Sequence, residues 1–187
     1  MRLSPSTIGP AFVIPVLALA ACGRPQGEAA AADDFIDPEQ MILTALPNST
    51  GARWTIWANG LGIGFGKDAA APYISLTCRL KSGQQPRLTV IRHATSEPEA
   101  KALFAVLGNG IAARFKVDAV LADGEGWRWE ATLQASAGEF DVFTGPREIE
   151  ATLPGAGTIL FPPSNLPREF IAWCRRNGEE FSLPAPG

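Results

Sequence analysis

The sequence contains a single histidine, His93, and only three cysteines among its 187 residues. One histidine leaves little room for acid–base catalysis or for a His-rich metal site. No G-x-S-x-G segment is present, so the turn that usually presents a serine nucleophile is missing. The 16 lysines and arginines form no basic block and are outnumbered by 19 acidic residues, which gives no electrostatic reason to expect nucleic acid as a partner. We therefore expect no catalytic, cofactor-binding or metal-binding residues.

The sequence also lacks an apolar run long enough to cross a membrane as a helix. The longest such stretch, residues 11–21, has 11 residues, whereas a bilayer needs about 20. Its length fits the apolar core of a secretion signal instead. It ends in Leu19-Ala20-Ala21-Cys22, which resembles the lipobox of bacterial lipoproteins. The alternative is an ordinary cleavage site that happens to lie beside a cysteine.

The lipobox resemblance implies three segments. Residues 1–21 would be a cleaved signal peptide, and Cys22 would carry the acyl chains that anchor the protein. Residues 22–34 are rich in alanine and glycine and read as a flexible tether, followed by one domain at residues 35–187. Gly23 stands where an aspartate would favour inner-membrane retention, so the expected location is the outer membrane, facing the periplasm.

Removing the lipidated cysteine leaves Cys78 and Cys174 as a pair in an oxidising compartment. We predict one disulfide between them. Two buried free thiols are the first alternative, and a reactive thiol with His93 as its base is the second.

Period-two alternation of apolar residues dominates the domain. Residues 73–80 place Cys78 on the apolar face, and residues 87–93 return after a turn cluster, so the two runs predict a hairpin. Further strands are expected at residues 53–57 and 127–133. Residues 140–143 and 149–153 are also interpreted as a hairpin.

Residues 96–117 allow two interpretations. Ser96-Glu97-Pro98-Glu99 has the form of a capping box, which favours a helix over the following residues. Gly108-Asn109-Gly110 is a strong turn signal between two runs of alternating residues, which favours a hairpin. We favour the hairpin.

The end of the domain has helical character. An N-cap candidate at Ser164 or Asn165, an early proline, two late arginines and the stop signal Gly178 predict a helix, with Cys174 in its last turn. The predicted fold class is α+β: a mostly antiparallel β-sheet, sandwich or barrel-like, with one C-terminal helix.

Two patterns suggest binding sites. The glycines of residues 60–67 have GxGxGxG spacing, which matches no phosphate-binding loop, so we interpret them as a strand that a ring or backbone approaches closely. Trp57, Trp127 and Trp129 are a possible ligand platform, and the alternative is that tryptophans fill the core. Glu148 and Glu150 are expected on a solvated strand face.

The lipobox and the domain together resemble small proteobacterial periplasmic lipoproteins. The shared short motifs lie at Trp54, Phe65-Gly66, Leu76-Thr77-Cys78, residues 138–142 and Trp173-Cys174-Arg175. The resemblance supports the architecture and the disulfide, and it implies no activity.

The functional expectation is a non-enzymatic binding or structural module of the cell envelope. It would touch the membrane through its lipid anchor and bind another envelope protein or a glycan. The alternatives are a periplasmic hydrolase inhibitor that uses the proline-rich loop at residues 161–167, and an enzyme that uses His93.

Overall fold

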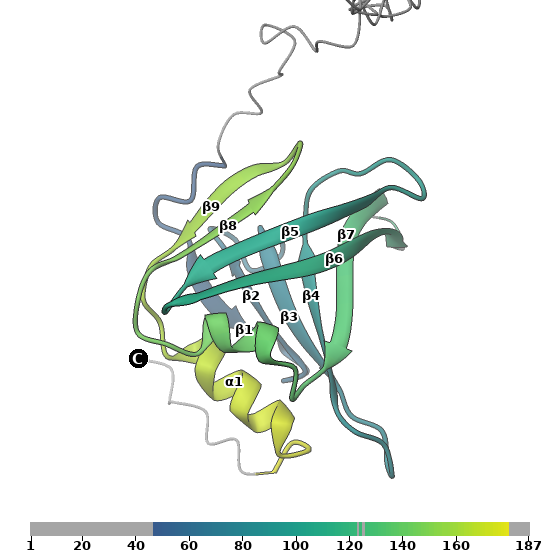
Figure 1. Cartoon of the computed structure of the whole chain (residues 1–187), viewed down its shortest axis with the longest axis vertical. Coiled ribbons are helices and arrows are strands. Elements are labelled where there is room, and N and C mark those ends of the chain that lie inside the picture. Colours follow the sequence, from purple (N-terminus) through teal and green to yellow (C-terminus); the bar gives the residue numbers. More distant parts are fainter. Residues whose placement is uncertain (1–46, 123, 125, 180–187) are drawn as a thin grey trace, which may run out of the picture. The chain divides into compact units, whose positions relative to one another are not determined.

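The computed structural model describes residues 47–122, 124 and 126–179 (Figure 1). The predicted signal peptide, Cys22 and the tether lie outside the described residues. The elements are β1 (Arg53–Ile56), β2 (Gly62–Gly66), β3 (Ile74–Arg79), β4 (Arg87–Arg92), β5 (Lys101–Gly108), β6 (Ile111–Ala122), β7 (Gly126–Gln134), the 3-10 helix η2 (Gly138–Phe143), β8 (Ile149–Leu153), β9 (Gly157–Phe161) and α1 (Leu166–Arg175).

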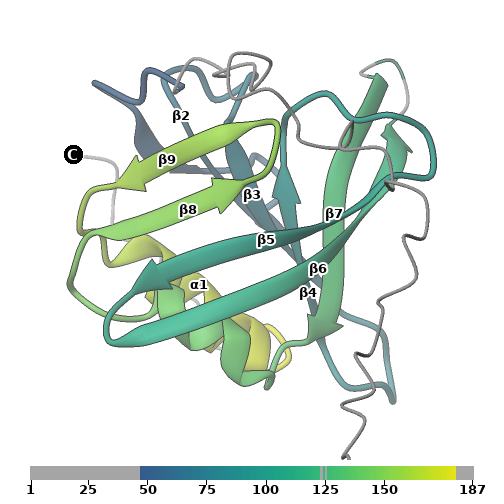
Figure 2. The same cartoon turned by 45° about the horizontal axis from the view of Figure 1, so that its top comes forward.

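The nine strands form one antiparallel sheet in the order β1-β2-β3-β4-β7-β6-β5-β8-β9. The sheet curls into a nearly closed barrel (Figures 1 and 2). Its two edge strands meet through aromatic side chains, because Phe161 of β9 lies 5.7 Å from Trp54 of β1 and 4.8 Å from Phe65 of β2, measured between ring centroids. The predicted fold class is confirmed: a barrel-like antiparallel sheet with one C-terminal helix.

The β3–β4 hairpin is present as predicted, with Cys78 paired to Leu88 across the two strands. The inward-facing residues Ile74, Leu76 and Val90 are completely buried. Alternation therefore assigned the inner and outer faces of this hairpin correctly.

The favoured hairpin at residues 96–117 is also present, and the helical alternative is wrong. Asn109 and Gly110 both have positive φ, 54° and 80°, as a tight two-residue turn requires. The Asn109 side chain also bonds to residues outside the turn. It donates to the carbonyl of Val142 at 2.8 Å and accepts from the backbone N–H of Arg147 at 2.9 Å.

The predicted hairpin between residues 140–143 and 149–153 is wrong. Residues 140–143 belong to η2, and β8 pairs instead with β5 and with β9. Phe140 and Phe143 are three positions apart, so in a 3-10 helix they project from the same side. Both contact Phe115 in the core, at ring-centroid distances of 5.4 and 6.3 Å. Both phenylalanine rings are buried against Phe115, and this burial outweighs the local sequence pattern that favours a strand.

The C-terminal helix is confirmed as α1, and Gly178 follows it with a φ of 80°. A disulfide joins its last turn to β3: the Cys78 and Cys174 sulfur atoms are 2.00 Å apart across a sequence separation of 96. This is the pairing predicted from the cysteine count. The helix and η2 lie side by side at one end of the barrel (Figures 1 and 2).

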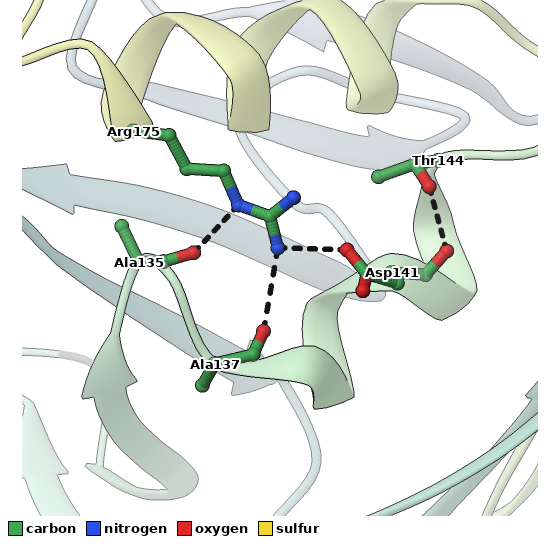
Figure 3. Close-up of polar contacts among 5 residues, drawn as sticks. All are labelled: Ala135, Ala137, Asp141, Thr144 and Arg175. Atoms are coloured by element: carbon green, nitrogen blue, oxygen red, sulfur yellow. Dashed lines mark hydrogen bonds and ion pairs between the residues drawn. The ribbon is translucent and has the colours of Figure 1, made fainter.

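Arg175 ties α1 to the segment that leads into η2 (Figure 3). Its guanidinium donates to the carbonyls of Ala135 and Ala137, at 2.8 and 3.3 Å, and forms an ion pair of 2.8 Å with Asp141. The disulfide and this arginine hold the helix from two sides.

Candidate binding groove

Trp57 lies flat on the glycine-rich strand β2. A β carbon added to Gly62 would be 2.5 Å from Cε3, 2.7 Å from Cδ2 and 3.0 Å from Cζ3 of the Trp57 ring. Three ring atoms at such similar distances place the face of the six-membered ring, rather than its edge, over the glycine. The pyrrole end reaches Gly64, where an added β carbon would be 3.3 Å from Nε1. Close approach of a ring is therefore the role of these glycines.

The glycines do not form a phosphate-binding loop. Residues 62–66 pair with β1 on one side and with β3 on the other, so they form an interior strand of the sheet. Ile63 and Phe65 are completely buried in the core, and the glycines face outward under Trp57 and Pro72. The interpretation of this run as a strand is confirmed.

A groove of about 1120 Å³ begins at Trp57 and extends over the rim of the sheet to the start of β7. Its walls come from the residues after β1, the loop before β3, the residues after β4 and the first residues of β7. They are Ile56, Trp57, Ala58, Ala69, Ala70, Ala71, Pro72, Tyr73, His93, Ala94, Thr95, Trp127 and Arg128. Among these described lining residues none is acidic.

The three tryptophans of the predicted platform do not act together. Trp57 and Trp127 line the same groove and are half-buried. Trp129 belongs to the buried core, and its buried indole N–H has no hydrogen-bond partner among the residues that the structure describes. Trp129 therefore fills the core, as the alternative expected, and the platform role of Trp57 and Trp127 stays a prediction.

His93 lies in the groove and is held by a serine that the sequence analysis did not identify. The His93 Nε2 and Ser75 Oγ atoms are 2.9 Å apart. Ser75 is completely buried and is not among the lining residues, so its hydroxyl orients the imidazole beneath the groove surface. The register could have indicated this contact, because Ser75 pairs with Ile91, two residues before His93 on the same outward face.

Arg128 and Glu130 form an ion pair beside the groove. The Glu130 Oε1 atom accepts from Arg128 Nε and lies 2.8 Å from Arg128 Nη2, and both side chains are largely shielded from solvent. The groove therefore has hydrogen-bonding groups from His93, Arg128 and Thr95, with the arginine charge balanced locally.

Arg92 supports the groove from inside the barrel. Its buried guanidinium donates to the carbonyls of Tyr73 and His93, at 3.0 and 3.2 Å, and to that of Ala156 in the β8–β9 turn, at 2.9 Å. Burial lowers the pKa of Arg92 to about 10, and the nearby Tyr73 partly offsets this effect. One side chain thus fixes two groove segments and joins them to the opposite edge of the barrel.

The other sequence candidates occupy ordinary positions. Glu148 and Glu150 are exposed. Pro162 and Pro163 lie in the short link between β9 and α1, and Pro167 lies in the first turn of α1. A second hollow, of about 550 Å³, lies at the polar β3–β4 turn beside Asn177. It has no aromatic wall, so we regard the larger groove as the candidate site.

In the part of the chain that the structure describes, no three His, Cys, Asp or Glu side chains are grouped to hold a metal ion. Within the same residues, no helix has the length and apolar character to span a bilayer. Comparison with family models, curated proteins and solved structures finds no match.

Proposed function

We propose that the protein is a non-enzymatic binding module of the cell envelope, anchored through Cys22, which binds its ligand in the groove beside Trp57. The observation that carries the proposal is the Trp57 ring. The strand beneath it has glycines at the two positions that the ring covers, and the ring lines the larger of the two hollows described above. A large, rigid aromatic surface beside a few polar groups is typical of a binding site.

The anchor is supported by Leu19-Ala20-Ala21-Cys22 and by the expected tether at residues 22–34. Metabolic labelling with a radioactive fatty acid tests it. We expect label in the full-length protein and its recovery with outer membranes. The Cys22→Ala variant should carry no label and should not fractionate with the membranes. Equal labelling of both proteins would contradict the anchor.

The binding site is tested by photo-crosslinking in intact envelopes. A photoreactive amino acid replaces Ala70, which is exposed in the groove, and in a control it replaces Lys116, which is exposed on β6. We expect a discrete adduct from position 70 and none from position 116. The same adducts from both positions, or none from position 70, would refute the proposed site.

A further inference from the structure

We infer that the ligand of the groove is a carbohydrate chain, one ring of which stacks on the free face of Trp57. This inference rests on the proposed function and names the class of ligand. One face of the indole covers Gly62. The other face is turned away from the strand, and the ring lines the groove.

A sugar ring fits such a surface because it presents C–H groups on its faces and hydroxyls around its edge. The face of an indole carries partial negative charge and attracts C–H groups. Trp127 provides a second aromatic side chain along the groove, and His93, Thr95 and Arg128 provide hydrogen-bonding groups beside it. The groove thus combines aromatic side chains with hydrogen-bonding groups, as a glycan combines apolar faces with polar edges.

The size and charge of the groove favour a neutral chain over a single small molecule. Its volume of about 1120 Å³ exceeds the roughly 300–1000 Å³ that is usual for small-molecule pockets. Arg128 is already paired with Glu130, so no strongly charged group is needed on the ligand.

The backbone beneath the groove argues against an extended peptide. Peptides that bind as strands take their main-chain hydrogen bonds from an unpaired sheet edge. β2 is paired with β1 and β3, and β4 is paired with β3 and β7. β2 and β4 therefore leave no free edge beneath Trp57. At the groove a peptide strand would find only the four-residue edge strand β1 and the three residues of β7 before Trp129.

The test is a calorimetric and tryptophan-fluorescence titration of the mature chain with two probes, the β-1,4-linked hexamers of N-acetylglucosamine and of glucose. We expect at least one hexamer to bind. Trp57→Ala should weaken that binding about tenfold or more, as expected for a central aromatic contact. Gly62→Ala should weaken it to a similar extent, because the added methyl group occupies the position of the ring and displaces it.

Gly138→Ala is the matched control. Gly138 is exposed, its φ is not positive, and the nearest atom to an added β carbon is 4.0 Å away, so binding should not change. Circular dichroism checks that each variant is folded, and Trp57→Ala decides the outcome if Gly62→Ala does not fold.

Binding of neither hexamer, or unchanged affinity in Trp57→Ala, would overturn the carbohydrate assignment. If the Ala70 crosslink persists and its adduct is a protein, only the ligand class is wrong and the proposed function stands. If neither the crosslink nor hexamer binding is observed, both proposals fail.

Discussion

At the scale of single residues, Arg92 has the most demanding position in the barrel. Its side chain is almost completely buried, and its guanidinium donates to three backbone carbonyls rather than to a carboxylate. Burial of a guanidinium is costly, which is why its pKa falls to about 10. The hydrogen bonds offset that cost because they satisfy carbonyls from three segments that would otherwise lack these donors.

Replacing Arg92 with alanine should therefore lower the free energy of unfolding by about 3 kcal/mol, since three carbonyls each lose a donor and a cavity remains. Urea denaturation measures this change. Arg114→Ala, at an exposed position on β6, is the control and should change the stability by less than about 0.5 kcal/mol. Equal stabilities of the two variants would mean that Arg92 does not support the groove.

Residue-scale reasoning from sequence located Trp57, Trp127 and His93 but could not assign their surroundings. Alternation places Trp127 and Trp129 on one face, yet Trp127 lies beyond the last β4–β7 pair, Arg92 with Trp129. Trp127, which lies past the end of β4, therefore reaches the rim of the barrel. Trp129, two positions further along the chain, is enclosed in the core. This difference depends on strand length and register, which the alternation does not encode.

At the scale of elements, the β5–β6 turn connects more than its own two strands. Asn109 adopts a positive φ and also bonds to Val142 in η2 and to Arg147 in the segment before β8. Gly145 packs directly against its side chain, leaving no room for a β carbon. The turn thereby holds the segment between η2 and β8 against the β5–β6 hairpin.

Asn109→Ala should destabilise the protein by about 1–3 kcal/mol, because alanine tolerates positive φ poorly and both side-chain hydrogen bonds are lost. Asn109→Gly separates the two contributions: it restores the backbone freedom but not the hydrogen bonds, so its stability should lie between wild type and alanine. Thermal unfolding followed by circular dichroism gives the order. A glycine variant less stable than the alanine variant would contradict this account of the turn.

Local sequence patterns predicted the hairpins, whose two strands are neighbours in the sequence. They failed where contacts with residues distant in the sequence determine the structure. The β3–β4 and β5–β6 hairpins carry their own turn signals and alternation. Residues 140–143 are also followed by a turn-like run, Thr144-Gly145-Pro146-Arg147. Their two phenylalanines are nevertheless directed by Phe115, which comes from β6. β5 likewise pairs with β8, which is not its neighbour in the sequence, and alternation within a strand does not indicate such a partner.

At the scale of the whole molecule, the helix end of the barrel and the groove are stabilised separately. The disulfide and Arg175 hold α1 against β3 and the segment before η2. The groove is held by Arg92 and by the glycines beneath Trp57. Loss of the disulfide should therefore lower global stability without removing the ligand site at temperatures where the protein remains folded.

The double variant Cys78→Ala/Cys174→Ala should lose about 2–5 kcal/mol of stability, because the disulfide closes a loop of nearly one hundred residues and restricts the unfolded chain. Chemical denaturation with and without reductant measures the effect. Reduced wild type should resemble the double variant, and the double variant itself should not respond to reductant. A wild type that is equally stable in both conditions would show that the bridge contributes nothing.

Two surfaces of the barrel compete as the place where a partner binds. One is the groove, and the other is the outer face of β5 and β9, where Leu103, Leu107 and Leu160 are about half exposed. Isolated exposed leucines are common on soluble proteins. The groove has, in addition, the aromatic ring of Trp57, which packs on the glycines of β2.

Hydrogen–deuterium exchange of the mature protein, with and without solubilised envelope material, distinguishes these surfaces most directly. We predict slower exchange in residues 56–58, 69–73 and 93–95 when the material is added, and unchanged exchange in β5 and β9. Protection of β5 and β9 with no change around Trp57 would contradict the central claim that the groove is the binding site.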